Sequence, residues 1–169
     1  TSLTRNFTLT GPTFMTLKIP LNNARFNGSF INFAYVGQDG DEREHCSMIF
    51  DGTLNQPRNG TDINNGGNNT FNLRNVAETV HNWPVACYAG QSQRGVIETW
   101  NVIVDTTGPN IPLTLPTNGD TLIISPAVFN FTAIDVFGSN MTCNLTVDGS
   151  VFAGNENFLA VNNTMTNRS

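Results

Sequence analysis

The residues most able to do covalent chemistry are the three cysteines, Cys46, Cys87 and Cys143. Trp83, Val85 and Cys87 alternate along one expected strand and share its buried face, and Cys46 begins an earlier strand with a buried face of its own. The sequence therefore predicts a Cys46–Cys87 disulfide, with two reduced core thiols as the alternative. Such a bond closes a loop of about 40 residues and contributes about 3–4 kcal/mol in the chain-entropy description.

Cys143 has no partner in the chain once Cys46 and Cys87 are paired. It repeats the setting of Cys46, because both cysteines are followed, after four residues, by Asp-Gly: Asp51-Gly52 and Asp148-Gly149. A nucleophilic thiol needs a nearby histidine and an electropositive setting. Cys143 has neither in its sequence neighbourhood, so no catalytic residue is expected here and the chain is not read as an enzyme.

Metal chemistry is suggested by one acidic stretch. Oxygen-rich loops at the ends of β-sandwiches can hold Ca²⁺, and four carboxylates crowd one loop: Asp39, Asp41, Glu42 and Glu44. The second half of the chain offers only Asp135 in the corresponding region, and no ligand spacing is recognisable. A solvated loop is therefore preferred over a calcium site, and no metal or cofactor is predicted.

The two histidines, His45 and His81, are the remaining candidates for metal binding or proton transfer. A zinc site needs three or four clustered ligands, and the sequence places none beside either histidine. His81 is expected to be exposed. Trp100 is a candidate for a sugar-stacking platform, although packing in a core or between domains is the commoner role of such a residue.

Acceptor sites for N-linked glycans recur along the whole chain. The pattern Asn-X-Ser/Thr marks surface asparagines in secreted proteins, and it is found at Asn6, Asn27, Asn59, Asn68, Asn130, Asn140, Asn144, Asn162 and Asn167. The alternative is that Asn- and Thr-rich strands generate the pattern by composition alone. We expect several of these sites to carry glycans.

Composition separates this chain from several functional classes. Only 12% of its residues are charged, whereas soluble domains average about 25%. The formal net charge is −5, and no Lys/Arg cluster is present to neutralise phosphates, so nucleic acid is not an expected partner. No apolar run is long enough to span a membrane. A glycosylated protein that is extracellular or on the cell surface fits this composition.

The elements that position these residues are strands. Apolar residues recur with period two, and Gly, Asn, Asp and Pro separate the runs. Asp51-Gly52 and Asp148-Gly149 are two-residue turns that favour positive φ and close hairpins. The sequence predicts an all-β fold of tandem sandwiches, with seven strands in the first complete copy at roughly 14–19, 29–36, 45–50, 53–56, 69–75, 80–88 and 97–104.

The chain repeats itself with a period near 100 residues, which is a domain length. Cys143 lies 97 residues after Cys46, and Gly108-Pro109 lies 97 residues after Gly11-Pro12. Residues 1–10 are therefore expected to be the last strand of a preceding repeat or a donor strand. Residues 11–108 are expected to form a complete domain, and residues 109–169 the first part of a second domain, completed by unseen or donated strands.

Two explanations fit this arrangement. The chain is either part of a longer repetitive protein, or its copies complete one another by strand exchange. Half of a sandwich exposes an apolar face and unpaired strand edges. In either case something else must cover residues 109–169.

Four motifs in order resemble the Ig-like repeats of large archaeal and bacterial cell-surface proteins. They are a Phe-X-Phe-like strand (Asn32-Phe33, and Phe129-Asn130-Phe131), Cys46 to Gly52, His81 to Cys87, and Val104 to Pro109. The similarity covers residues 14–109 as a whole repeat and residues 110–169 as a partial one. It implies a stalk, adhesin, surface-layer or filament module. Pro84 departs from a regular strand and is expected at an edge or bulge.

The function expected from these features is structural: a module of a glycosylated, pilus-like filament or S-layer-type assembly. Its expected partners are other copies of itself, arranged head to tail and joined by β-strand donation in one variant. The alternatives are an adhesin, a carbohydrate-binding accessory module of a secreted protein, and a virion structural protein.

Overall fold

All regular secondary structure in the described part of the chain is β-strand. The computed structural model describes residues 14–38, 45–59, 63–89, 92–96, 98–123 and 125–169, with side chains for all of these except residues 14, 38, 45, 56–59, 89 and 92–96. Within those ranges no helix is long and apolar enough to cross a membrane. The expectations for residues 1–10 and for Asp39, Asp41, Glu42 and Glu44 fall outside the described residues.

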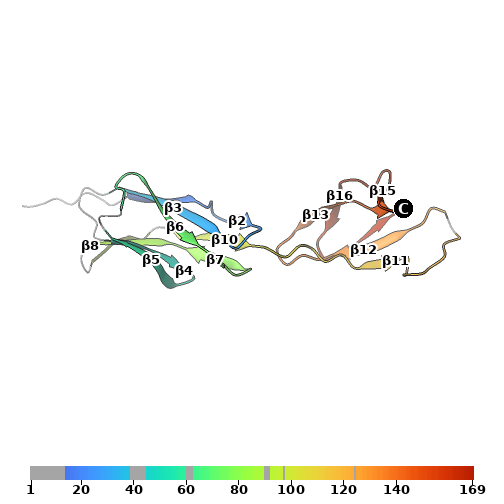
Figure 1. Ribbon diagram of the computed structural model, residues 1–169, viewed down its shortest axis with the longest axis horizontal. Coiled ribbons are helices and arrows are strands. Elements are labelled where there is room, and N and C mark those ends of the chain that lie inside the picture. The colour runs from blue at the N-terminus through green and yellow to red at the C-terminus, as the bar shows by residue number, and fades with distance from the viewer. Residues whose placement is uncertain (1–13, 39–44, 60–62, 90–91, 97, 124) are drawn as a thin grey trace, which may run out of the picture. The chain divides into compact units, whose positions relative to one another are not determined.

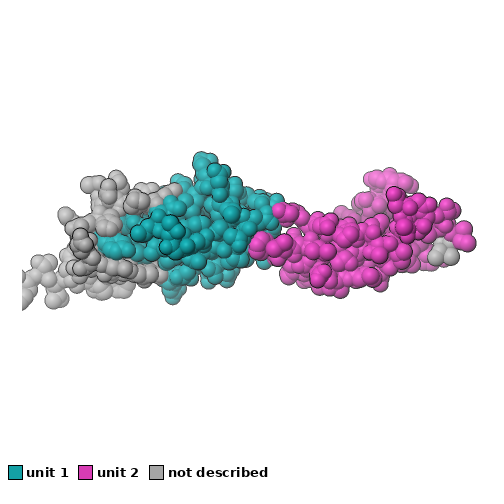
Figure 2. All heavy atoms as spheres, turned by 90° about the horizontal axis from the view of Figure 1, so that it is seen from below, with its two compact units in different colours: residues 1–106 teal, residues 107–169 magenta. Residues whose placement is uncertain are grey.

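The chain divides into two units, residues 1–106 and residues 107–169, which Figure 2 colours separately. The division falls inside the Val104–Pro109 motif. Each unit has its own cluster of buried apolar side chains. The chain is thus a tandem of β-sandwich units of the Ig-like or fibronectin-III-like type, and the two are described in turn.

The first sheet of unit 1 is three-stranded and antiparallel, in the order β1-β3-β6 (Figure 1). Its central strand has one face that is fully buried, at Ile31, Phe33 and Tyr35. On the other face Asn32 is exposed, whereas the small residue Ala34 is buried. The strands are β1 (Phe14–Ile19), β3 (Ile31–Gln38) and β6 (Asn68–Leu73).

The second layer of unit 1 consists of the sheets β5-β4-β8-β9 and β2-β10-β7. Pro84 lies between β7 and β8, where the chain changes its outer partner from β10 to β9. Proline has no N–H to donate there, and the chain breaks between two strands at this residue, whereas the sequence predicted an edge or a bulge. The strands are β2 (Ala24–Phe26), β4 (His45–Phe50), β5 (Thr53–Asn59), β7 (Val80–Trp83), β8 (Val85–Ala89), β9 (Ser92–Val96) and β10 (Trp100–Val104).

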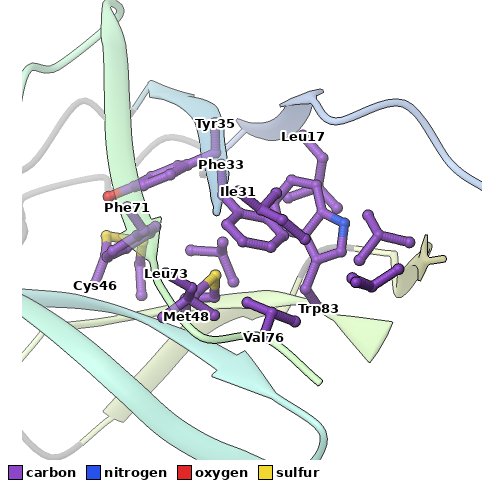
Figure 3. Packing of buried hydrophobic residues seen from close by; sticks show 14 residues of the cluster. Leu17, Ile31, Phe33, Tyr35, Cys46, Met48, Phe71, Leu73, Val76 and Trp83 are labelled. Atoms are coloured by element: carbon purple, nitrogen blue, oxygen red, sulfur yellow. A yellow bond between two sulfur atoms is a disulfide. The ribbon is translucent and has the colours of Figure 1, made fainter. Parts of the chain in front are cut away.

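The core of unit 1 lies between these layers and is built around aromatic rings (Figure 3). Trp83 packs edge to face against Phe33, with ring centroids 4.9 Å apart, and against Trp100, at 6.1 Å. Phe33 also meets the edge of Phe50 at 5.8 Å. Trp100 is half-buried in this contact, so its ring packs on the core and is not a free stacking platform.

Unit 2 contains a three-stranded sheet, β11-β12-β17, and a pair, β13-β16, with the short hairpin β14-β15. Its buried cluster is small: Phe131 and Ala133 from β12, and Phe158 and Ala160 from β16. The strands are β11 (Leu113–Leu115), β12 (Phe129–Ala133), β13 (Asn140–Cys143), β14 (Thr146–Val147), β15 (Ser150–Val151), β16 (Phe158–Val161) and β17 (Thr164–Arg168).

Local geometry repeats between the units. Asp51 and Gly52 have φ of 50° and 77°, and Asp148 and Gly149 have φ of 52° and 79°, as expected for hairpin turns with two positive φ angles. Two short strands were not anticipated from the sequence. Residues 24–26 form β2 in parallel with β10, and residues 92–96 form β9 beside β8.

Candidate functional site

A polar contact that joins two strands of unit 1 surrounds the Asp51-Gly52 turn. The left-handed backbone at Asp51 turns its carboxylate toward β7. Its Oδ1 accepts a hydrogen bond from the backbone N–H of Asn82 at 2.9 Å, and its Oδ2 lies 2.6 Å from Nδ1 of His81. The turn that ends β4 therefore also holds the start of β7.

His81 is buried, with 5% of its side chain exposed, so the expectation that it is exposed was wrong. The reason is parity: His81 shares its strand face with Trp83, and β7 is buried at both residues. Its Nε2 lies 2.8 Å from the carbonyl oxygen of Ala77, and its ring stacks on Phe50 with centroids 4.8 Å apart. Both ring nitrogens thus lie within hydrogen-bond distance of an acceptor oxygen. The His81–Asp51 contact therefore joins β7 to the turn after β4, and among the described residues no third metal ligand accompanies it.

The disulfide joins Cys46 of β4 to Cys87 of β8, and both residues are fully buried. The two cysteines are directly opposite in the antiparallel register, with Cα atoms 4.0 Å apart. The neighbouring pair Ile49–Pro84 is hydrogen-bonded, N to O at 2.9 Å. Pairs alternate along an antiparallel ladder, so Cys46–Cys87 is a non-hydrogen-bonded pair, where side chains approach most closely. The bond lies within one sheet.

Unit 2 contains the same strand–turn pattern with a different outcome. Cys143, the counterpart of Cys46, is a free thiol and half-buried. It packs with Met141 and Leu145 against the small cluster of unit 2. Asp148, the counterpart of Asp51, has no hydrogen bond or ion pair within the described part of the chain. The structure thus shows one turn with its partner strand and one without.

The glycan acceptor sites fall into distinct environments. Asn162 is pinned by its own side chain: Oδ1 accepts from the N–H of Asp135 at 2.9 Å, and Nδ2 donates to the carbonyls of Asp135 and Gly138 at 2.7 and 2.6 Å. Asn130 is half-buried in the middle strand of its sheet. The side chains at five other sites are exposed: Asn27, Asn68, Asn140, Asn144 and Asn167.

A glycan on Asn162 would replace one of two N–H groups that are both donated to backbone carbonyls. The Asn162 side chain therefore stabilises the local backbone, whereas the exposed sites have room for a sugar. Asn59 ends β5 and its side chain is not described, and Asn6 lies outside the described residues.

Metal and acid–base sites are not assembled by the residues that the structure describes. Among them, no group of three or more His, Cys, Asp or Glu side chains is placed to hold an ion. Asp135 is the carboxylate at the position of the second repeat that corresponds to the acidic loop. It makes a local contact, because its Oδ1 accepts a hydrogen bond from the backbone N–H of Phe137 at 2.8 Å. The candidates Asp39, Asp41, Glu42 and Glu44 lie outside this description.

Comparison with protein-family models and with curated proteins finds no match. Several solved structures are similar at the level of the fold. The fibronectin(III)-like modules of Clostridium thermocellum CbhA are 19% identical over 86% of this chain and 74% of that one, with a TM-score of 0.49. The endo-beta-1,4-mannanase from Thermotoga petrophila is 10% identical over 56% of this chain and 20% of that one, with a TM-score of 0.43.

A third similar structure is the central fibronectin-III array of RIM-binding protein, 12% identical over 94% of this chain and 56% of that one, with a TM-score of 0.32. At these identities and TM-scores the likeness does not extend beyond the class of fold. This chain spans only a fifth of the mannanase. What the protein does has to be inferred from its own residues.

Proposed function

We propose that this protein is a structural module of an extracellular, glycosylated assembly, a pilus-like filament or an S-layer-type array, whose partners are other copies of the chain. The observation that carries the proposal is the repeated unit: the pattern of a Cys-bearing strand followed by an Asp-Gly hairpin is built twice in one chain. In a protein built from repeated sandwich modules, the successive modules act together as one extended structure.

Three further features support an extracellular role. The Cys46–Cys87 bond within the core of unit 1 suits an oxidising compartment. Five acceptor asparagines are exposed, from Asn27 in unit 1 to Asn167 in unit 2. Charged residues make up only 12% of the chain, and attached sugars would supply the solubility that charge supplies elsewhere.

The role is mechanical and does not involve catalysis. The most specific polar constellation in the described residues, Asp51 with His81 and Asn82, joins two strands of the same unit and is 5% exposed at the histidine. A contact of this kind holds two strands in register, because separating them breaks hydrogen bonds to a carboxylate.

Location and assembly together test this proposal. Antibody labelling of intact source cells, combined with electron microscopy of the material released from their surface, is expected to show the protein in regular filaments or lattices. Glycopeptide mass spectrometry of the same material is expected to find sugars on exposed acceptor sites. A protein that is found only inside the cell, without glycans and monomeric at all concentrations, contradicts the proposal.

A further inference from the structure

We propose that residues 140–148, which contain β13 and β14 and have one edge unpaired among the described residues, accept a β-strand of the same type as β7–β8, carried by another module of the assembly. The inference rests on the proposed function, since it names the chemistry by which modules meet. The occupant is an antiparallel strand with alternating apolar side chains, a cysteine opposite Cys143 and a histidine beside Asp148.

Unit 1 shows what this edge holds when it is filled. There β4 is paired on both sides, with β5 along one edge and with β8 along the other. Backbone hydrogen bonds extend the second pairing through the turn, from Ile49 N–H to Pro84 O at 2.9 Å and from Asp51 N–H to Asn82 O at 3.1 Å. The strand line β7–Pro84–β8 thus covers the whole length of β4.

In unit 2 the equivalent strand is paired on one side only. Within the described residues β13 pairs with β16 and with no other strand. The N–H of Asn162 donates to Ser139 O at 3.0 Å, so the odd-numbered residues of β13 direct their backbone groups toward β16. The backbone groups of Thr142 and Asn144 therefore point to the opposite edge, which is the place that β8 takes beside β4.

Side-chain burial also indicates that a neighbouring strand is missing beside β13. Cys46 and Met48 on β4 are fully buried, whereas their counterparts Cys143 and Leu145 are half-buried. An apolar row that faces a core on one side and is open on the other matches a missing neighbour strand. The outward residues of the same stretch, Thr142 and Asn144, are exposed in the ordinary way.

A second strand position is also open in unit 2. The turn before β2, in which the Ala24 N–H donates to Leu21 O at 3.0 Å, has a counterpart in the Asp120 N–H, which donates to Thr117 O at 3.0 Å. After this turn unit 1 forms β2, which pairs in parallel with β10. Unit 2 forms no strand at residues 121–123 and leaves Ile123 96% exposed. Unit 2 thus has two unfilled strand positions, which correspond to β7–β8 and to β10 of unit 1.

The carboxylate of Asp148, at one end of the open edge, specifies the incoming strand further. Asp51 binds His81 and Asn82 of the strand that covers β4. Asp148 has the same left-handed backbone, with φ of 52° against 50° at Asp51, and its carboxylate is unused in the described part of the chain. A strand that places a histidine beside Asp148 and a cysteine beside Cys143 repeats the spacing of His81 and Cys87.

The test uses the full chain and a synthetic peptide with the sequence of residues 80–89, whose cysteine carries a 5-thio-2-nitrobenzoate leaving group. The thiolate of Cys143 attacks the peptide sulfur, forms the mixed disulfide and expels thionitrobenzoate, whose release is followed by absorbance. The matched control peptide exchanges Trp with its preceding Asn and Val with its following Ala, which breaks the alternation but retains the composition and the cysteine.

The native-order peptide is expected to react at least about tenfold faster than the control peptide, because docking holds the two sulfurs within reach. The variant Asp148→Asn is expected to remove part of that advantage, and Glu156→Gln, an exposed acid outside the edge, is expected to leave it unchanged. Equal rates for the two peptides overturn the proposal.

A second readout avoids thiol chemistry. With a peptide that carries serine in place of its cysteine, amide hydrogen exchange is expected to slow at Thr142 and Asn144 and to be unchanged at Met141, which already faces β16. Protection of the same amides by raising the protein concentration alone would show that a copy of this chain fills the edge with a segment other than β7–β8, which already lies beside β4 in its own unit, and would overturn the strand type proposed here. Surface location and filament formation are measured separately, so failure of the peptide test leaves the proposed function standing.

Discussion

The disulfide in unit 1 offers the most quantitative test of the fold. Cys46 and Cys87 are 41 residues apart, and a cross-link of that length removes about 13 cal/mol/K of entropy from the unfolded chain. At 25 °C this amounts to about 4 kcal/mol of stability. For a unit of this size, such a loss corresponds to a fall of about 15–30 °C in Tm.

The perturbation is reduction of the bond in a Cys143→Ser background, which keeps both core sulfurs in place and removes the half-buried thiol as a competing partner. Unfolding by guanidinium is followed through tryptophan fluorescence, because Trp83 and Trp100 both lie in unit 1. The reduced protein is expected to unfold at markedly lower denaturant concentration.

The double variant Cys46→Ala/Cys87→Ala is expected to lose at least as much, since truncation also removes buried sulfur contacts. Oxidised and reduced proteins that unfold within about 1 kcal/mol of each other would refute the reasoning. That result would mean that the core alone fixes the β4–β8 register.

Other substitutions test the remaining contacts. His81→Ala is expected to destabilise unit 1 by about 2–4 kcal/mol, because the Ala77 carbonyl and the Asp51 carboxylate lose their partner; Val80→Ala, at an exposed site of the same strand, is expected to change stability by less than about 1 kcal/mol. Asn162→Ala removes three hydrogen bonds and is expected to cost about 2–3 kcal/mol in thermal unfolding of unit 2. Phe131→Ala is expected to cost about 3–5 kcal/mol in unit 2, and an equal loss in the tryptophan-monitored transition of unit 1 would contradict the division into two units.

Much of the fold follows from local sequence. Period-two alternation in residues 31–35 and 45–50 predicts strands with one buried face, and the structure has strands there. The Asp-Gly turns follow from the positive φ that glycine tolerates and that aspartate accepts at low cost. Cys46 and Cys87 could be paired in advance because both lie on apolar strand faces.

Other features depend on contacts between residues distant in the sequence. Strand β2 is only three residues long, and it is a strand because it pairs with residues of β10 that lie 78 positions later in the chain. The role of His81 depends on Asp51, which lies 30 residues away. The sequence analysis assigned His81 to the wrong face of its strand, and this error of one position reversed the expectation for the burial of His81.

Sequence alone determined that this chain is a tandem of β-sandwich units, that Cys143 is unpaired, and where sugars could be attached, since each of these is written in residue types and their spacing. Tertiary structure decided which acceptor asparagines are free, because the side-chain amide of Asn162 is hydrogen-bonded to the backbone of residues 135 and 138. It also decided which edge is open, since among the described residues β13 pairs with β16 alone. Hydrogen bonding between strands is a property of neighbours in space, and no local pattern contains it.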